Sequence, residues 1–253
     1  MNVKGRRVWV TGASAGIGRA VTIELVRRGA TVIASARNES ALTELARECG
    51  ADRVLVLPLD VTDRRANQRA ADEIHRRLGG LDIAFFNAGT CEYVDVGRFD
   101  SALFERAMRT NFLSMVYGIE AVLPLLRQSP SPQLVGMSST VAYGGLPRSE
   151  AYGASKAAIK NLFESLQIDL LSDGISVSVV CPGFVRTPLT DRNDFPMPFR
   201  IEADEAARRI VDGIEAKMPE IHFPKRFSLL FKLLTLLPNR LYISLCAKLV
   251  TQP

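Results

Sequence analysis

Tyr152 and Lys156 stand four positions apart in the stretch YGASK, within a run of residues that has helical periodicity. Positions i and i+4 share one face of a helix, so the phenol and the amine would point into the same space. A free phenol has a pKa near 10, but a neighbouring ammonium stabilises the phenolate and lowers that pKa. Such a pair can serve as a general acid and base, although a packing tyrosine beside a solvated lysine has the same spacing.

A glycine-rich stretch, VTGASAGIGRA at 10–20, follows the first apolar run and precedes a helical pattern. Small residues allow the backbone to approach a pyrophosphate, and the helix N-terminus supplies free N–H groups and the positive end of its dipole. Between a strand and a helix, this stretch predicts a dinucleotide site. The loop residues expected to bind the dinucleotide are Gly12, Ser14, Gly16, Ile17 and Gly18.

The residues after the second apolar run indicate which dinucleotide binds. An acidic residue about 20 positions beyond the glycines would bind the ribose 2′-hydroxyl of NAD. Ala36 and Arg37 stand at that place instead. A guanidinium can pair with a 2′-phosphate in a forked geometry, whereas a carboxylate would repel it. The sequence therefore predicts NADP(H) as the cofactor in preference to NAD(H).

Short apolar runs alternate with longer amphipathic stretches along most of the chain. Strands with little polar alternation are buried on both faces of a sheet, and helices between them imply parallel crossovers. The pattern predicts one α/β domain over 1–222, a doubly wound Rossmann-like parallel sheet of about seven strands with helices on both faces. The predicted strands are 6–12, 31–36, 53–59, 81–89, 133–139, 176–183 and 220–223, and the predicted helices are 17–28, 39–48, 63–77, 102–127, 151–172 and 203–216.

Residues 223–253 depart from this rhythm and predict a C-terminal amphipathic helical extension, interrupted at Pro238. Polar residues recur there every three or four positions and leave a wide apolar face, whose apolar runs are too short to span a bilayer. The extension is expected to be a subunit interface or a lid, or alternatively a pair of helices that lie on a membrane. The recurring polar residues are Lys225, Ser228, Lys232, Thr235, Asn239, Arg240, Ser244, Lys248 and Thr251, and the basic residues expected on the polar side are Lys225, Arg226, Lys232, Arg240 and Lys248.

The composition narrows the class of protein. The 253 residues are 47% hydrophobic and 23% charged, which is typical of a soluble globular protein. The net charge of +5 is modest and its arginines are scattered beside acids, which favours solvated helix faces over a nucleic-acid surface. No apolar signal segment precedes the first strand, and we expect a cytoplasmic protein. Neither the cysteines nor the histidines have metal-ligand spacing: Cys49, Cys91, Cys181, Cys246, His75 and His222.

A set of short motifs, in order and at consistent spacings, resembles the short-chain dehydrogenase/reductase family. The resemblance extends from about residue 5 to about residue 215. It implies an oxidoreductase with a tyrosine as its general acid and base. The motifs are TGASAGIG at 11–18, DVT at 60–62, NAG at 87–89, Asn111, SS at 138–139, YGASK at 152–156 and PGFVRT at 182–187.

The resemblance implies four catalytic residues. Tyr152 would donate or accept the proton, and Lys156 would also contact the nicotinamide ribose. Ser139, thirteen residues before the tyrosine, would hydrogen-bond the substrate oxygen, with Ser138 as the competing serine. Asn111 would support a water-linked proton path to the lysine.

The remaining motifs imply further cofactor contacts. One pair would lie on the adenine side, a second group beneath the cofactor, and a third group at the nicotinamide amide. In that order they are Asp60 and Val61; Asn87, Ala88 and Gly89; and Pro182, Gly183, Val185 and Thr187.

The expected activity is transfer of a hydride between nicotinamide and a carbonyl or secondary alcohol. Apolar residues in the loop 188–202 suggest an apolar small-molecule substrate: Leu189, Phe195, Met197 and Phe199. One alternative is an acyl-chain or steroid-type reductase at a membrane, with peripheral contact through 224–250. Another is a catalytically silent regulator, against which the complete set of catalytic residues argues. The family resemblance implies a homodimer or homotetramer formed through 102–127 and 151–172.

Overall fold

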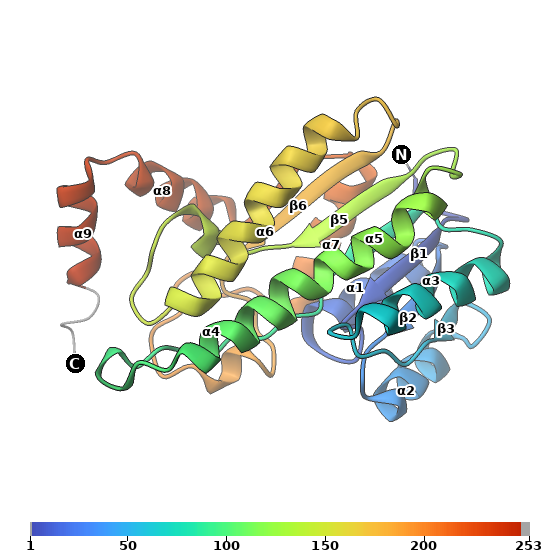
Figure 1. The fold of residues 1–253 in the computed structure, drawn as a ribbon, viewed down its shortest axis with the longest axis horizontal. Helices are drawn as coiled ribbons and strands as arrows, with labels where there is room; N and C mark the ends of the chain where they lie inside the picture. The colour runs from blue at the N-terminus through green and yellow to red at the C-terminus, as the bar shows by residue number, and fades with distance from the viewer. Residues whose placement is uncertain (1, 249–253) are drawn as a thin grey trace.

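A parallel sheet in the order β3-β2-β1-β4-β5-β6-β7 forms the centre of the protein, in a computed structural model that describes residues 2–248 (Figure 1). The strand order reverses between β1 and β4, which opens a crevice at the carboxyl ends of those strands. The strands are β1 (Arg7–Thr11), β2 (Thr31–Ser35), β3 (Val54–Val56), β4 (Ile83–Phe86), β5 (Gln133–Met137), β6 (Ser176–Pro182) and β7 (Glu220–Phe223).

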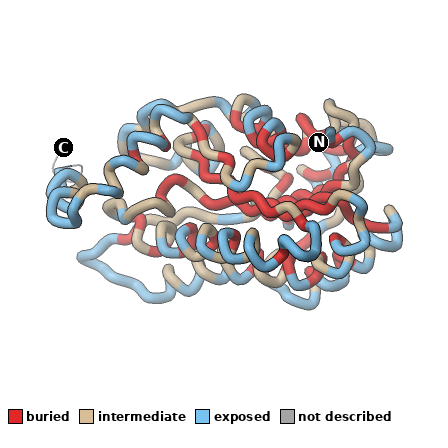
Figure 2. Tube along the Cα trace, turned by 90° about the horizontal axis from the view of Figure 1, so that it is seen from above, coloured by how far each residue is buried: buried red, intermediate tan, exposed pale blue. Residues whose placement is uncertain are grey.

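Helices cover both faces of the sheet. One face packs against α1 (Gly16–Arg27), α2 (Glu39–Cys49) and α7 (Ala203–Glu215). The other packs against α3 (Arg64–Leu78), α5 (Ser114–Leu126) and α6 (Glu150–Asp169). The predicted doubly wound parallel sheet is therefore confirmed, and Figure 2 shows its buried strands between two more exposed layers.

Strand β1 shows how the two hydrophobic cores arise. Val8 and Val10 pack on the α1 side, while Trp9 between them packs on the α5 side, as the period of two in a strand requires. The buried indole N–H of Trp9 donates to Ser35 Oγ at 2.8 Å. Leaving that N–H unpaired would cost about 1–3 kcal/mol, so the bond allows a tryptophan in the sheet.

The predicted helix 102–127 is wrong in one respect. The structure divides it into α4 (Ser101–Ala107), a π-helical turn (Met108–Leu113) and α5. A π-helical turn holds one extra residue per turn, and such turns are frequent at functional sites. Apolar periodicity over a long stretch does not reveal one extra residue, and this turn carries Asn111.

The C-terminal extension consists of α8 (Lys225–Thr235) and α9 (Asn239–Ala247) on either side of Pro238, at one end of the molecule (Figure 1). Lys232, one of the basic residues expected on the polar side of this extension, pairs with Glu220 of β7. Ser228 is buried, and its hydroxyl lies 2.7 Å from His222 Nδ1 of β7. The polar stripe of α8 therefore faces the protein. Thr251 lies outside the described residues.

Candidate active site

A cleft of about 680 Å³ lies at the carboxyl ends of the central strands. Its walls come from the loops that follow β1 to β6, which are far apart in the sequence. Among the site residues predicted from sequence, all line this cleft except Gly18 and Asn111. The parallel topology gathers them, because every strand ends at the same edge of the sheet.

Tyr152 and Lys156 lie on the first turns of α6 and reach the cleft together. The Lys156 Nζ lies 5.6 Å from the centre of the Tyr152 ring. It donates to the carbonyl oxygen of Met137, at the end of β5, at 2.8 Å. Lys156 is only 3% exposed, so the sheet edge holds its ammonium beside the phenol and away from water.

Burial changes the pKa of both groups. It lowers the pKa of Lys156 from 10.5 to about 8, because the charged ammonium loses its solvation. It raises the pKa of Tyr152 above 10, and a hydrogen bond from Ser139 only partly offsets this. The expected lowering of the Tyr152 pKa by a neighbouring ammonium is wrong in this structure: burial raises the pKa, and the group that lowers it is Ser139. The phenol keeps its proton at neutral pH and is prepared to donate it.

The two neighbouring serines have different environments. Ser138 is buried, and its hydroxyl donates to the backbone oxygen of Lys156 at 2.8 Å. The hydroxyl of Ser139 is half-buried, accepts from the Val141 amide at 3.3 Å, donates only at a long 3.5 Å to Pro182 O and reaches the phenol of Tyr152. Ser139 is therefore the serine whose hydroxyl is available to a bound molecule, while Ser138 fixes the backbone beneath the lysine.

Asn111 is fully buried behind the cleft. Its Oδ1 accepts from the amide of Thr90 at 2.7 Å, and its Nδ2 donates to Thr90 O at 3.0 Å and to Ser155 Oγ at 2.9 Å. The π-helical turn thus ties the loop after β4 to α6. The close packing at this point favours glycine at position 89, because a Cβ there would lie 3.0 Å from Asn111 Oδ1 and 3.5 Å from Lys156 Nζ.

We expect Lys156→Met to stabilise the fold by about 1–2 kcal/mol at pH 7. The lowered pKa corresponds to about 3 kcal/mol of unfavourable ammonium burial, and loss of the bond to Met137 O cancels part of the gain. Below about pH 8 the lysine is protonated in both states, so the full penalty applies. Between about 8 and 10.5 the folded state has released its proton, and the advantage of the variant shrinks.

Urea unfolding of both proteins at pH 7 and pH 10 measures this difference. Lys160→Met, one turn further along α6, is the matched control, since Lys160 pairs with Glu164 at the surface. We expect the control to change stability by less than about 0.5 kcal/mol. A destabilised Lys156→Met protein at pH 7 would show that the ammonium is not strained.

The glycine loop fits a pyrophosphate. Helix α1 begins at Gly16, no side chain caps its first N–H groups, and its first turn has no acidic residue. Gly16 has a φ of +53°, and a Cβ there would lie 3.2 Å from Thr187 Cγ2, in the gap between the loop and the opposite wall. A Cβ on Gly18 would lie 2.2 Å from Gly12 O. The donors and the space suit a dinucleotide, with Ser14 and Ile17 also lining the cleft.

Arg37 is exposed at the far end of the cleft, beside Asn38. Asp60 lies near it and accepts from the amide and the hydroxyl of Thr62, at 2.9 and 2.8 Å. These hydrogen bonds hold the pKa of Asp60 below its ordinary value, with a smaller contribution from the charge of Arg37. Val61 lines the same region. The Asp60 carboxylate is thus occupied locally, and the guanidinium faces the cleft.

Asn87 and Ala88 join the end of β4 to the glycine loop. Asn87 Nδ2 donates to Thr11 O at 3.0 Å, and the amide of Ala88 donates to Thr11 Oγ1 at 3.2 Å. The opposite wall follows β6: Pro182, Gly183, Val185 and Thr187. Thr190 supports that wall, since its hydroxyl donates to Val185 O at 2.6 Å.

Sequence reasoning missed several residues of the cleft. Thr190 belongs to no motif. The only signal in the sequence for a role at the cleft is that it is a second threonine, three positions after Thr187. Cys91 does not line the cleft, yet its thiol influences the pKa of Tyr152. Other lining residues that belong to no motif are Asn38, Thr90, Glu92, Arg106 and Thr110.

Aromatic rings pack behind Gly183, which lines the cleft. Phe195 of the loop 188–202 lies 5.5 Å from Tyr93 and 6.1 Å from Phe184, measured between ring centres. Phe227 of α8 lies 5.6 Å from Phe184. Phe199 is 52% exposed at the rim. These rings form an aromatic cluster beside the cleft wall at Gly183.

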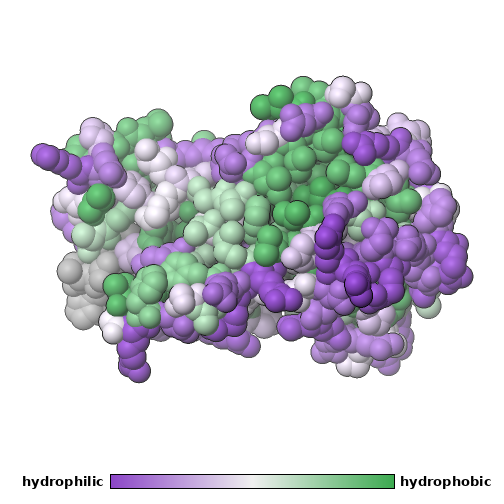
Figure 3. All heavy atoms as spheres, in the orientation of Figure 1, coloured by the Kyte–Doolittle hydropathy of each residue, from purple (hydrophilic) through white to green (hydrophobic). Residues whose placement is uncertain are grey.

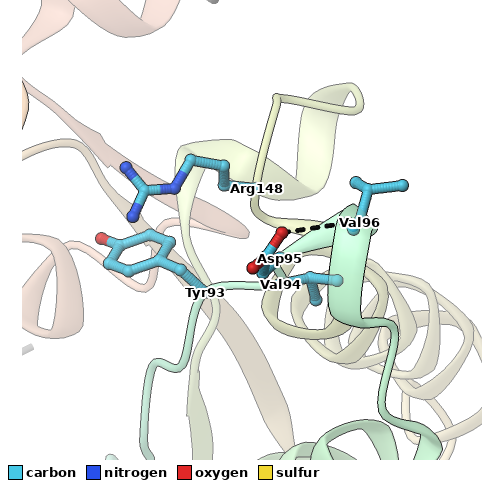
Figure 4. Close-up of a pocket in the computed structure, with 6 residues that line it drawn as sticks. Tyr93, Val94, Asp95, Val96 and Arg148 are labelled. Atoms are coloured by element: carbon cyan, nitrogen blue, oxygen red, sulfur yellow. Dashed lines mark hydrogen bonds between the residues drawn. The ribbon is translucent and has the colours of Figure 1, made fainter.

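A second cavity of about 430 Å³ lies where the segment after Cys91 meets Arg148 (Figure 4). The guanidinium of Arg148 lies over the Tyr93 ring, 5.3 Å from its centre, and pairs with Asp194 at 2.9 Å. The hydroxyl of Tyr93 donates to Asn193 at 2.8 Å. These contacts attach the loop 188–202 to the rim of the active-site cleft.

Comparisons with known proteins agree with this geometry. Residues 6–197 match the family model described as short chain dehydrogenase. An uncharacterized oxidoreductase from Myxococcus xanthus is 36% identical over 94% of this chain and 94% of its own length. An 11-beta-hydroxysteroid dehydrogenase 1A from Arabidopsis thaliana is 32% identical over 94% of this chain and 74% of its own length.

Solved structures share the fold. A short-chain dehydrogenase/reductase from Burkholderia phymatum, in complex with NAD, superposes with a TM-score of 0.85 at 22% identity, over 92% of this chain and 94% of that one. A short-chain dehydrogenase from Streptomyces avermitilis superposes with a TM-score of 0.80 at 24% identity, over 98% of this chain and 96% of that one.

Proposed function

The chain belongs to the short-chain dehydrogenase family, and from that membership we propose an NADP(H)-dependent reductase of apolar carbonyl compounds, or an oxidase of the corresponding alcohols. One observation supports it most strongly: a protonated phenol, a half-buried serine hydroxyl and a buried lysine lie together at one end of a dinucleotide-sized cleft.

Each residue has a proposed task. Ser139 donates a hydrogen bond to the carbonyl oxygen of the substrate and orients it toward Tyr152. Tyr152 delivers its proton to that oxygen as negative charge develops there. Lys156 places positive charge beside the phenolate that remains, and Asn111 holds the loop and helix on which the lysine depends. The bound cofactor supplies the hydride in reduction and accepts it in oxidation.

The preference for NADP(H) rests on Arg37. Its exposed guanidinium follows β2 where an acid would favour NAD, and the nearby carboxylate of Asp60 is already occupied by Thr62. Gly12, Ser14, Gly16, Ile17 and Gly18 would bind the pyrophosphate.

A steroid-type or acyl-chain reductase at a membrane is the second candidate. Two observations favour it over a reductase of small polar carbonyls. The aromatic cluster beside Gly183 suits a large apolar substrate, and one relative is named an 11-beta-hydroxysteroid dehydrogenase.

We also propose a cytoplasmic homodimer or homotetramer, with 1–222 as the catalytic domain and 223–253 as an extension. The four cysteines are unpaired, which suits a reducing compartment. Ile168 and Leu171 are 71% and 74% exposed at the end of α6. Figure 3 shows an apolar area over α5 and α6, which supports an interface there.

A spectrophotometric screen tests the activity. We expect NADPH oxidation with large apolar ketones, and weaker turnover with small polar aldehydes. The panel should include steroid ketones, 3-oxoacyl thioesters, quinones and short aldehydes, each with NADPH and with NADH. A protein that binds NADPH but turns over none of them would instead support a silent regulator.

A further inference from the structure

The outer surface of the C-terminal helices exposes large hydrophobic side chains in an unusual density. On α8, Leu233 is 63% exposed, and Leu236, just beyond its end, is 79% exposed. We define the α8–α9 surface by its exposed apolar residues: Leu229, Leu230, Leu233, Leu236, Leu241, Ile243 and Leu245.

The inner faces of the two helices explain why these leucines point outward. Phe231 and Ser228 of α8 are buried against the protein, and Lys232 pairs with Glu220. On α9 the hydroxyl of Tyr242 donates to Gly145 O at 2.6 Å. The orientation of both helices is thus set by specific contacts, and the leucines are left exposed by them.

The charge of this segment has one sign. Residues 224–253 contain five basic residues and no aspartate or glutamate. Arg226 on α8 and Arg240 on α9 are exposed next to the leucines. Figure 3 shows hydrophobic and hydrophilic side chains mixed at this end of the molecule. A surface that combines exposed leucines with arginines that have no acidic residue in the same segment is complementary to a layer with an apolar interior and an anionic surface.

We propose that the α8–α9 surface docks on the surface of an anionic lipid bilayer. Leucines enter the boundary of the acyl chains while Arg226 and Arg240 meet the anionic headgroups. No helix within residues 2–248 is long and apolar enough to cross a membrane, so the contact is peripheral. A second copy of this chain is a poorer occupant, because a two-fold contact would bring the same cations together.

Docking would place the apolar end of the cleft next to the lipid. The inner face of α8 carries Phe227, whose ring packs on Phe184 at the rim of the active site, 5.6 Å away. A Cβ on Gly183, which lines the cleft, would lie 2.8 Å from the Phe227 ring. One helix therefore contacts the cleft on one side and presents its leucines on the other. This inference concerns binding and does not depend on the proposed reaction.

Co-sedimentation of the full chain with vesicles tests the proposal. We expect strong binding to phosphatidylcholine vesicles that contain 30% phosphatidylserine. The affinity for pure phosphatidylcholine vesicles should be lower by a factor of about ten or more, and high salt should abolish binding to the anionic vesicles. Arg226→Glu with Arg240→Glu should weaken binding by more than about tenfold, since each cation contributes about fivefold. Leu230→Ser with Leu233→Ser should do the same by reducing the apolar area.

Val96→Ser with Phe99→Ser is the matched control, because these residues are as exposed (70% and 63%) but lie before α4, outside α8–α9 and outside the proposed subunit interface. It should bind anionic vesicles like the unmodified chain. Circular dichroism checks that every variant is folded. Unchanged vesicle binding in both α8–α9 variants would overturn the proposal, as would the absence of binding by the unmodified chain. A lipid-free change of molecular mass in the leucine variant, measured by sedimentation velocity, would assign the surface to a second copy instead.

Discussion

Tyr152→Phe is expected to reduce kcat by about a thousandfold while leaving the affinity for NADPH within about threefold of its original value. General acid catalysis by a positioned side chain contributes about 10²–10⁴-fold. Burial raises the pKa of the Tyr152 phenol, so the phenol is protonated at neutral pH. It lies beside Ser139 and can donate that proton. Phenylalanine keeps the ring and its packing against Lys156 but has no proton to give.

Single-turnover kinetics and a fluorescence titration with NADPH separate the two effects. Tyr93→Phe is the matched control, because its hydroxyl also lies near the cleft but donates to Asn193. We expect the control to keep kcat within about fivefold, with any change confined to KM. Near-normal turnover by Tyr152→Phe would contradict the assignment of the proton donor, whatever the substrate.

Arg37→Asp is expected to reverse the preference between the two cofactors. Loss of a charge-assisted pair with the 2′-phosphate, and repulsion by the new carboxylate, should lower kcat/KM for NADPH by about a hundredfold. The same carboxylate can accept from the ribose 2′-hydroxyl of NADH, so kcat/KM for NADH should rise.

Steady-state kinetics with both cofactors, at saturating substrate, measure the change. Arg47→Asp on the exposed side of α2 makes the same change of charge away from the cleft and should alter neither value by more than about twofold. An unmodified chain that already prefers NADH would refute the proposed role of Arg37. That result would not change the roles proposed for the residues that transfer the proton.

The sheet and its main elements were predictable because their signals are local. Parallel strands buried on both faces appear as short apolar runs, and β2 and β7 occupy almost the predicted residues. The glycine loop and the four-residue spacing of Tyr152 and Lys156 likewise need only a strand and a helix in the right order. Spacing also favoured Ser139 over Ser138, and the structure places the Ser139 hydroxyl toward the phenol.

Three features depended on contacts between distant segments. The π-helical turn that aims Asn111 at Thr90 and Ser155 inserts one residue into an otherwise regular periodicity. The direction of the Tyr152 pKa shift depends on how much solvent the surrounding segments exclude. The pocket around Tyr93 and Arg148 joins two segments, 93–97 and the loop that carries Arg148, which no motif relates.

By itself, the sequence determined the secondary structure, the parallel sheet and the order of the motifs, since these follow from side-chain periodicity along the chain. Only the tertiary structure decided which face of α8 meets the protein. Ser228 and Lys232 find partners in His222 and Glu220 of β7, so this side of α8 turns inward and Leu229, Leu233 and their neighbours stay outside. An amphipathic pattern shows that a helix has two faces, and only its partners determine which face is buried.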